Sequence, residues 1–528
     1  MQMSLFDGND DFRFRKPIRL IEFFAGYGSQ ALALKELGVE FEHWRICEWA
    51  VKSIQAYKDN HFSDDNKDYS QYFTSEYIFK VLAEWGISQN YNEPLTLEQI
   101  KRLGEKECRK IYNNILSTHN LVNISRVKAK DLQIEDTDKY DYVLTYSFPC
   151  QDLSRAGLGK GMARDSGTRS GLLWEVERII DECAELGNLP KVLLMENVPD
   201  VIGTKNLPHF IVWRDKLESL GYKCYWQVLN SKDYSIPQNR ERCFMISILG
   251  DYYYSFPQSY PLINKLVDVL ETQVEEKFYL SQKAIKGKLE TKFSETSFDG
   301  CLPLACELRC DEGIRTFKDN VMGALRTIDS CGDKHIIEPT LKEQLCDRLV
   351  ESGLLKVGTV INHSYTSPNT RRQTLEDYIE SENGVCNTLT TRPDVLGIAV
   401  EDLTTKNKRL ASMVDKIDPT KTQAIDMFNQ SVHDEMHTIK TNIDRANMTA
   451  VTQNLRIRKL TPRECFRLMG VRDENFERIA KSQSNASLYH LAGDSIVVSV
   501  LVAILGQFVD GFDFNEYIVN FYNQIKEK

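Results

Sequence analysis

The sequence has no CxxC pair, although it contains 13 cysteines among its 528 residues. Zinc sites of the finger type and thioredoxin-like redox motifs depend on such close pairs, so neither is expected, and no metal site is predicted. An odd number of scattered cysteines in a long chain is typical of reduced thiols in a cytoplasm, not of a disulfide framework. The cysteine pattern therefore predicts a cytoplasmic protein.

The chain also lacks a signal-peptide pattern and a long hydrophobic run. Residues 1–16 are polar, and the most apolar stretch, Ser495–Val509, is too short to span a bilayer. We expect that stretch to be a buried helix, and we expect no membrane partner. A hydrophobic content of 42% with 27% charged residues is ordinary for a globular protein, and the length allows more than one domain.

Positive charge is not in excess, since the formal net charge is -10 at pH 7. A protein that binds nucleic acid without sequence preference usually carries a net basic surface, so this balance argues against that class. It does not exclude a protein whose basic residues line a single cleft. Net charge alone therefore does not exclude an enzyme that acts on a specific nucleic-acid sequence.

The first regular pattern is a strand, a glycine turn and a helix. Ile18–Phe24 is apolar and β-rich, residues 25–29 read Ala-Gly-Tyr-Gly-Ser, and Ser29 is predicted to cap a helix through Leu37. This order begins a Rossmann-like unit, in which glycines let the backbone approach a ligand. A glycine turn alone is weak evidence, because tight turns need glycine in any case.

A second strand, Phe41–Cys47, ends in an acidic residue and a tryptophan. Glu48 follows the glycine turn by about 20 residues, the spacing at which a carboxylate binds ribose hydroxyls. Trp49 offers a flat face for an adenine ring. Separately, a surface carboxylate and a core tryptophan would explain them, but as a pair they favour a cofactor that contains adenosine.

Residues 63–120 then interrupt the alternation of strand and helix. The segment is polar and helix-rich, with Thr74 or Ser75 predicted to cap one helix that ends at Gly86. Thr96-Leu97-Glu98-Gln99 has the form of a capping box for another. We interpret the segment as an inserted, solvated pair of helices and assign it no chemistry.

The next strand, Tyr142–Tyr146, leads into Ser147-Phe148-Pro149-Cys150-Gln151. Pro149 stiffens the backbone just before Cys150, and strand ends of an open α/β sheet are where ligands bind. A thiol held there is a candidate nucleophile. For a lone cysteine a buried structural role is the more common one, so the assignment depends on the motifs that accompany it.

Two further motifs complete the pattern. A buried strand, Lys191–Met195, delivers Glu196 to the same predicted sheet edge, where it is a candidate acid. The sequence Gln238-Asn239-Arg240-Glu241-Arg242 places two arginines at alternate strand positions, and therefore on one face. A charged strand face is usually just solvated, and only the family pattern below favours a role in the pocket.

Phe-Pro-Cys-Gln, Glu-Asn-Val and Gln-x-Arg-x-Arg, in this order, resemble the DNA (cytosine-5) methyltransferase family of bacterial or phage type. The resemblance implies an α/β fold: a Rossmann-like S-adenosylmethionine-dependent methyltransferase domain with a second, smaller, mixed target-recognition domain. It implies catalytic roles for Cys150, Glu196, Arg240 and Arg242. It places S-adenosyl-L-methionine against Phe24, Gly26, Gly28, Glu48, Trp49, Asn123, Ile124, Pro149, Asp494 and Ser495, and it places Gln151, Ser154 and Gln238 against DNA.

This sequence departs from the family pattern at two of these positions. Asn123 stands where relatives often carry Asp, and its carbonyl oxygen can still accept a bond from the adenine amino group. Asp494 stands where relatives commonly have Asn in Gly-Asn-Ser, within Tyr489–Ile496. The segment Arg458–Phe466 resembles the motif that supports the recognition domain.

The resemblance also divides the chain. We expect residues 1–251 to form the catalytic and cofactor-binding domain, residues 252–452 the target-recognition domain, and residues 453–528 a return to the catalytic domain. Three Thr-containing segments repeat in the middle region, before predicted strands at 335–337, 397–400 and 449–451. They place Arg326, Arg392 and Lys440 beside turns. These side chains either contact DNA or belong to hairpins that only brace the domain, and the residues alone do not separate the two.

Together these features predict an enzyme that methylates carbon 5 of a flipped cytosine in a specific double-stranded DNA sequence, through a covalent adduct with Cys150. The alternatives are an RNA cytosine-5 methyltransferase of the same fold and a non-catalytic DNA-binding relative. The long region 252–452 favours DNA, and the presence of Cys150 and Glu196 favours an enzyme. We expect a monomer, with a separately encoded cognate restriction endonuclease as a second partner.

Overall fold

A computed structural model describes residues 11–149, 153, 162, 164, 169–262, 264, 266–278, 304–309, 313–316, 322–323, 333–339, 424–426, 431–433 and 455–526. The chain divides into two compact units. The first comprises Met1–Glu271, Gly323–Ile328 and Pro462–Lys528, and the second comprises Thr272–Met322 and Asp329–Thr461.

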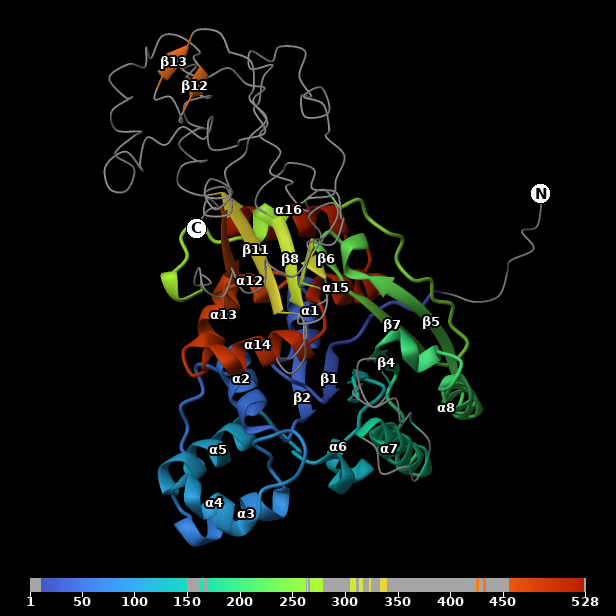
Figure 1. The fold of residues 1–528 in the computed structure, drawn as a ribbon. Helices are drawn as coiled ribbons and strands as arrows, with labels where there is room; N and C mark the ends of the chain where they lie inside the picture. Colours follow the sequence, from blue (N-terminus) through green and yellow to red (C-terminus); the bar gives the residue numbers. More distant parts are fainter. Residues whose placement is uncertain are drawn as a thin grey trace, which may run out of the picture. The chain divides into compact units, whose positions relative to one another are not determined.

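A six-stranded sheet in the order β2-β1-β3-β4-β7-β5 forms the centre of the first unit (Figure 1). Its neighbours β2, β1, β3 and β4 are parallel, while β7 runs antiparallel to both β4 and β5. The α/β class predicted from the sequence is thus confirmed, with a mixed sheet. The strands are β1 (Ile18–Phe23), β2 (Phe41–Cys47), β3 (Asp141–Tyr146), β4 (Val192–Asn197), β5 (Tyr222–Asn230) and β7 (Glu241–Leu249).

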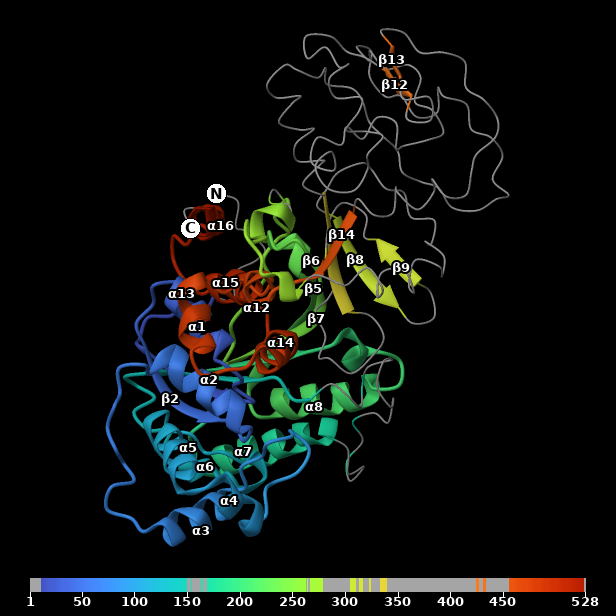
Figure 2. The ribbon, with the colours of Figure 1, turned by 60° about the vertical axis from the view of Figure 1, so that its left-hand side comes forward.

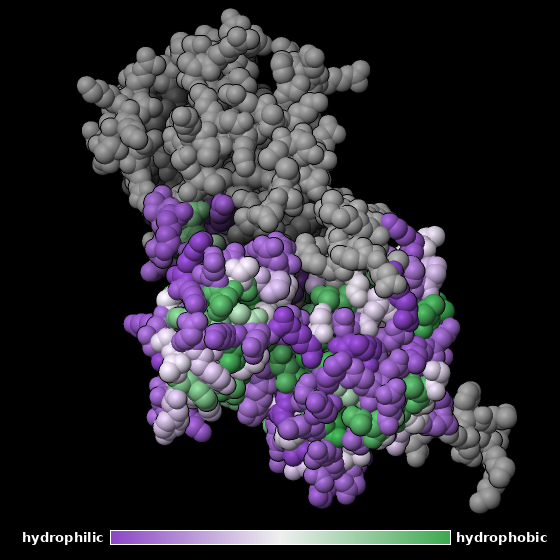
Figure 3. Space-filling view, turned by 90° about the horizontal axis from the view of Figure 1, so that it is seen from below, coloured by the Kyte–Doolittle hydropathy of each residue, from purple (hydrophilic) through white to green (hydrophobic). Residues whose placement is uncertain are grey.

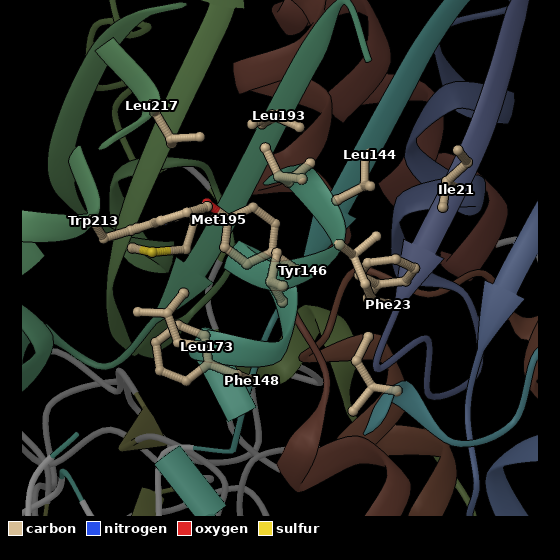
Figure 4. Packing of buried hydrophobic residues seen from close by; sticks show 14 of the residues in the cluster. Ile21, Phe23, Leu144, Tyr146, Phe148, Leu173, Leu193, Met195, Trp213 and Leu217 are labelled. Carbon is tan, nitrogen blue, oxygen red and sulfur yellow. The ribbon is translucent and has the colours of Figure 1, made fainter. Parts of the chain in front are cut away.

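One face of the sheet is covered by α7 (Leu173–Glu185) and α8 (Leu207–Ser219) (Figure 4). Because strand side chains alternate between faces, every second residue of the central strands points at these helices. Trp213 of α8 is fully buried, and its Nε1 donates to the Tyr146 hydroxyl at 2.9 Å. The residues that meet here include Ile21, Phe23, Leu144, Tyr146, Leu193, Met195, Leu173, Trp213 and Leu217.

The opposite face carries α1 (Ser29–Glu36) and α15 (Val498–Gly506), which contact each other (Figure 2). The crossover β1-α1-β2 runs toward the β2 edge of the sheet, and the crossover β3-α7-β4 runs in the opposite direction, toward β4. Because such crossovers are right-handed, α1 and α7 lie on opposite faces of the sheet. Every residue of α15 is buried, which confirms the predicted buried helix.

Within the described part of the chain, one stretch, Asn485–Gly506, is long and apolar enough to cross a membrane by length and composition alone. It is broken between α14 (Asn485–Asp494) and α15, and 78% of its most apolar window is buried inside the protein. These features are those of core helices of a folded domain.

The inserted segment contains three helices, not the predicted pair: α3 (Ser75–Trp85), α4 (Leu97–Leu103) and α5 (Glu105–Ser117). The predicted caps are confirmed, since the Thr74 side chain accepts from Tyr77 N and Thr96 forms a capping box with Gln99. Gly104 is both the C-cap of α4 and the N-cap of α5, and this one-residue boundary hid the third helix.

The three helices share a small hydrophobic core with the start of α2 (Val51–His61). The core includes Val51, Ile54, Ile78, Leu82, Ile100 and Ile111. Seen from the end of the molecule where α3 and α4 lie, the outer surface is mainly hydrophilic with small hydrophobic patches (Figure 3). The insertion is therefore an amphipathic layer with one side on the protein and one side in water.

The cap of α1 differs from the prediction. Gly28, with φ +84°, is the N-cap, and Ser29 is the first helical residue. No side chain makes a cap hydrogen bond at this helix. A side chain at position 28 would also collide with α2, because an added Cβ would lie 2.3 Å from His61 Nε2. Glycine is therefore needed here both for its backbone conformation and for close packing.

In the second unit, four strands form an antiparallel sheet in the order β14-β11-β8-β9. The predicted strand His335–Ile337 lies within β11, and the predicted strands 397–400 and 449–451 lie outside the described residues. A separate pair, β12 and β13, is also antiparallel. The strands are β8 (Leu304–Arg309), β9 (Gly313–Thr316), β11 (Asp333–Pro339), β12 (Ala424–Asp426), β13 (Ser431–His433) and β14 (Leu455–Lys459).

The remaining elements are short or follow the motif-bearing segments. The helices are α6 (Ala129–Leu132), α12 (Pro462–Arg467), α13 (Asp473–Ala480) and α16 (Phe514–Lys526), and the strands are β6 (Gln238–Asn239) and β10 (Met322–Gly323). Short 3-10 helices occupy Ile124–Arg126, Arg169–Leu172, Pro199–Ile202, Ser231–Asp233, Leu266–Val269 and Glu276–Phe278.

Candidate active site

A cavity of about 480 Å³ lies in the first unit where the parallel strands β1 to β4 end. Carboxyl ends of parallel strands share one edge of a sheet, and this edge is the usual ligand site of open α/β folds. The cavity brings together twelve of the residues predicted from the sequence: Phe24, Gly26, Glu48, Trp49, Asn123, Ile124, Pro149, Glu196, Arg240, Arg242, Asp494 and Ser495.

Glu48 is buried and is held by backbone amides. Gly26 N donates to its Oε2 at 3.0 Å and Ala50 N to its Oε1 at 2.8 Å. Burial raises the pKa of Glu48 to about 7, against the opposing effect of these hydrogen bonds. A carboxyl group fixed at the end of β2, beside a glycine turn, is placed to accept hydrogen bonds from a ligand's hydroxyl groups.

The backbone of Glu48 is fixed by Asn120, the last residue of the insertion. Glu48 N donates to Asn120 Oδ1 at 3.0 Å, and Asn120 Nδ2 donates back to Glu48 O at 2.8 Å. Val122 N donates to the same Asn120 oxygen at 2.9 Å. One buried amide side chain therefore joins the end of β2 to the segment that carries Asn123.

Trp49 and the Asn123-Ile124 pair line the cavity beside Glu48. Trp49 is partly buried and also packs against the core of the insertion. Asn123 Oδ1 accepts from Ser125 N at 3.1 Å, so one of its two lone pairs is used within the protein. The second lone pair can accept the predicted bond from an adenine amino group, and that bond stays a prediction.

Gly28 does not line the cavity, in contrast to Gly26. Its place is at the start of α1, where it makes room for His61 and Tyr57 of α2. Gly28 therefore has a packing role, its predicted cofactor contact stays a prediction, and Gly26 supplies the amide that binds Glu48.

Glu196, at the end of β4, is held by side chains. Arg242 Nε lies 3.0 Å from Glu196 Oε1, and the Ser147 hydroxyl is hydrogen-bonded to Glu196 Oε2. The Glu196 side chain is 6% exposed and that of Arg242 is 18% exposed. A buried carboxylate and a guanidinium thus face the same cavity as a fixed pair, the arrangement expected for proton transfer and charge stabilisation.

The chain that leads to Cys150 is fixed from two sides. Asn197 Nδ2 donates to Phe148 O at 2.9 Å, and the Ser170 hydroxyl donates to Pro149 O at 2.8 Å. Cys150, Gln151 and Ser154 lie outside the described residues. The described backbone up to Pro149 therefore reaches the cavity next to Glu196 on a stiff support.

Arg240 has a different task from Arg242. It is 3% exposed, and its Nη2 donates to Gly493 O at 3.0 Å and to Ser495 O at 2.7 Å. Tyr27 is hydrogen-bonded to the Ser495 hydroxyl at 2.7 Å. Arg240 was predicted to be catalytic, and the structure gives it a role in holding the end of α14 against the cavity.

The predicted DNA contacts are placed less favourably. Gln238 is fully buried, and its Nε2 donates to Leu468 O at 2.6 Å, so it cannot reach DNA in this conformation. Its position next to α12, which no local sequence pattern reveals, explains the difference. Arg326, Arg392 and Lys440 lie outside the described residues.

Several residues of the site were not singled out from the sequence. Ser147 and Asn197 lie within quoted stretches but were given no role there, and they bind Glu196 and Phe148, respectively. Glu22 does not line the cavity, but it is a buried acid in β1, a strand that is apolar apart from Glu22 and Arg19, and the sequence does show this contrast. Tyr91 and His490 also line the cavity. Tyr91 carries no sequence signal, and His490 lies in the segment Tyr489–Ile496, where the sequence assigns it no role of its own.

Comparison with known proteins gives a consistent result. The model of the family "C-5 cytosine-specific DNA methylase" matches residues 99–510, which leaves the glycine turn and Glu48 before the matched range. The orphan methyltransferase M.SssI of Spiroplasma monobiae is 39% identical over 282 residues, 53% of this chain and 71% of that protein.

Two further relatives agree. The type II methyltransferase M2.ScrFI of Lactococcus lactis subsp. cremoris is 38% identical over 273 residues, 51% of this chain and 71% of that protein. The orphan methyltransferase M.SPBetaI of Bacillus phage SPbeta is 26% identical over 432 residues, 75% of this chain and 88% of that protein. With the motif residues gathered in one cavity, the chain belongs to the C-5 cytosine-specific DNA methylase family and is a DNA (cytosine-5-)-methyltransferase that uses S-adenosyl-L-methionine.

Proposed function

We propose that methyl transfer takes place in this cavity, with the cofactor bound on one side and the cytosine activated on the other. Residues that follow β1 and β2, together with Asn123, Ile124, Asp494 and Ser495, hold the cofactor. Cys150 after β3, Glu196 at the end of β4 and Arg242 of β7 activate the cytosine. The observation that carries this proposal is the shared cavity itself, which Glu48 and Trp49 line together with Glu196 and Arg242. A pocket of this size with a few convergent polar groups suits a small-molecule ligand.

The cofactor side fits an adenosine-containing molecule. Glu48 accepts hydrogen bonds from the ribose hydroxyls. Trp49 packs on the adenine ring, and Asn123 and Ile124 flank that ring. Gly26 lets the backbone approach the methionine part, beside Phe24. Asp494 and Ser495 close this side from the end of α14. S-adenosyl-L-methionine bound here supplies the methyl group from its sulfonium.

The cytosine side supplies three functions. Cys150, as a thiolate, adds to carbon 6 of the ring and thereby makes carbon 5 nucleophilic. Glu196 provides a proton or a strong hydrogen bond to ring nitrogen 3, and Arg242 places positive charge near the ring carbonyl oxygen. Ser147 orients Glu196.

The cycle closes when a base removes the hydrogen from carbon 5. The electrons of that C–H bond form the C5–C6 double bond, and the Cys150 thiolate leaves carbon 6. Since the ring is unreachable inside a duplex, the target nucleotide must be flipped out of the stack. Gln151 and Ser154 then lie against the DNA backbone.

The substrate is proposed to be a specific sequence in double-stranded DNA, read by a target-recognition domain at residues 252–452 between the segments 1–251 and 453–528. The second compact unit covers most of this range, which supports the proposal. The family and the relatives are those of DNA methylases and methyltransferases, and this favours DNA over the RNA alternative.

Partners and location follow from the same relationship. A separately encoded restriction endonuclease is proposed because one relative is named a type II methyltransferase. A monomer in the cytoplasm is proposed, and the free thiols of Cys47, Cys108, Cys183, Cys224, Cys243 and Cys465 support a reducing compartment.

The direct test is covalent trapping with DNA that contains 5-fluorocytosine, because fluorine at carbon 5 cannot leave as a proton. The wild-type protein with S-adenosyl-L-methionine should form an adduct that survives denaturing electrophoresis, and Cys150→Ser should not. An adduct of unchanged yield with Cys150→Ser would assign the nucleophile to another residue.

A further inference from the structure

The insertion contributes a wall to the cofactor cavity. Tyr91, Asn92 and Pro94, from the loop between α3 and α4, line the cavity together with Glu48 and Trp49. This loop precedes residues 99–510, the range that matches the family model. None of its residues belongs to the motifs that carry the family resemblance.

The loop is tied to the backbone that presents Glu48. Ser88 N donates to Trp49 O at 2.8 Å, and Val51 N donates to Ser88 O at 2.9 Å. These two bonds form an isolated bridge between Ala50 and Ser88. The start of the loop is thus fixed directly beside the two residues proposed to bind adenosine.

The loop is also braced internally. Asn90 Oδ1 accepts from Asn92 N at 3.0 Å and from Glu93 N at 3.2 Å. The Ser88 hydroxyl donates to Glu93 O at 2.7 Å. An asparagine that bonds the backbone ahead of it makes a tight turn, so Tyr91 is presented on a defined backbone.

Tyr91 occupies an unusual conformation at this point. Its φ is +61°, a left-handed value that a bulky side chain seldom adopts. Such strain persists where the surroundings fix it, and it gathers at ligand sites. Here the Tyr91 hydroxyl lies 3.2 Å from Ser53 Oγ of α2, and its ring meets His490 of α14 edge-on, with centroids 4.3 Å apart.

We propose that Tyr91 is a cofactor-binding residue, supplied by the insertion, that packs against the adenosine part of S-adenosyl-L-methionine and determines its affinity. The residue spans the cavity wall between α2 and α14, and its contacts with Ser53 and His490 hold the ring in place. The inference rests on the proposed cofactor side of the cavity. It gives the insertion a function beyond that of a solvated helical layer.

The test is calorimetric titration of the full-length protein with S-adenosyl-L-methionine. Tyr91→Ala should raise the Kd roughly three- to tenfold, the amount expected for the loss of one aromatic contact. Tyr91→Phe keeps the ring and loses the bond to Ser53, so its Kd should rise less.

Tyr72→Ala is the matched control, because Tyr72 belongs to the same insertion and is 85% exposed. It should leave the Kd unchanged. If Tyr91→Ala does not fold, as judged by its thermal transition, Tyr91→Leu decides in its place, since it retains an apolar side chain without the ring. A folded variant of either kind that binds the cofactor as the wild type does would overturn the inference.

The outcome separates the inference from the proposal beneath it. A wild-type protein that fails to bind S-adenosyl-L-methionine would contradict the proposed cofactor side. A wild type that binds, together with a Tyr91 variant that binds equally well, would contradict only the role of Tyr91.

Discussion

Two buried glutamates in one cavity are held in different ways. Glu48 receives hydrogen bonds from the amides of Gly26 and Ala50, whereas Glu196 is bound by the side chains of Arg242 and Ser147. The first pair of donors is neutral and belongs to the backbone. The second includes a cation and depends on side chains that can be substituted.

The difference separates a binding group from a reacting group. Burial among neutral donors raises the pKa of Glu48 to about 7, so its charge depends on pH near neutrality. Glu196 is held by the Arg242 guanidinium and the Ser147 hydroxyl, which fix its carboxyl group at the place where the reaction needs a proton or a hydrogen bond. We therefore expect substitution of Glu48 to change the affinity for the cofactor, and substitution of Glu196 to change kcat.

The largest effect is expected for Glu196→Gln. The loss of a general acid should lower kcat on the order of 100- to 10,000-fold, with little change in the affinity for S-adenosyl-L-methionine. Rates with a saturating DNA substrate and calorimetry measure the two quantities. Glu177→Gln is the matched control, because Glu177 is also buried and paired with an arginine, Arg164, but does not line the cavity. A variant at position 196 with an unchanged kcat would remove Glu196 from the mechanism.

Glu48→Gln should act on binding. The loss of a charged acceptor for ribose hydroxyls should weaken cofactor affinity roughly tenfold to a hundredfold. Because the ionised carboxylate is the better acceptor, wild-type affinity should rise as the pH increases through about 7, and the variant should lose this dependence. Calorimetry from pH 6 to pH 8 tests both points. A pH profile that survives the substitution would assign the titration to another group.

Ser147→Ala should have a smaller effect, confined to the cytosine side. It removes the hydroxyl bound to Glu196 Oε2 while the Arg242 pair remains, so kcat should fall roughly tenfold and cofactor affinity should not change. Ser147→Thr, which keeps the hydroxyl, should recover part of the rate. Equal activity of the alanine variant and the wild type would show that Arg242 alone positions Glu196.

Glu22→Gln should affect activity least and stability most clearly. Burial raises the pKa of Glu22 to about 7, so the stability due to its neutral form is fully present below about pH 4.5 and is lost as the pH rises through 7. The free energy of unfolding of the wild type should therefore fall by up to ~3 kcal/mol relative to that of Glu22→Gln over this pH range. Urea unfolding at pH 5 and pH 8 measures the difference. Identical pH dependence in both proteins would refute the assignment.

Much of the site could be predicted because its residues follow strand ends. The bounds of β2 match the predicted strand, and Glu48, Pro149 and Glu196 reach one cavity because β2, β3 and β4 are parallel. Strand ends are set by local apolar patterns, which the sequence displays directly. The direction of β7 could not be read in this way, since residues of a buried strand look alike in parallel and antiparallel neighbours.

The contacts that the sequence did not reveal share another cause, because they join distant segments of the chain. Gln238 is turned inward by Leu468, and Arg240 is engaged by Gly493 and Ser495, each more than 200 residues away. Tyr91 reaches the cavity through contacts with Ser53 and His490. No periodicity or turn signal encodes such pairs, so they required the folded structure.

The most direct test of the divided cavity is the single-turnover rate of methyl transfer at saturating S-adenosyl-L-methionine, measured for Glu48→Gln and Glu196→Gln side by side. The account predicts that Glu48→Gln recovers a rate close to that of the wild type once its cofactor site is filled, while Glu196→Gln stays slow at every cofactor concentration. Equal rate losses in the two variants at saturation would contradict the division into a binding side and a reacting side.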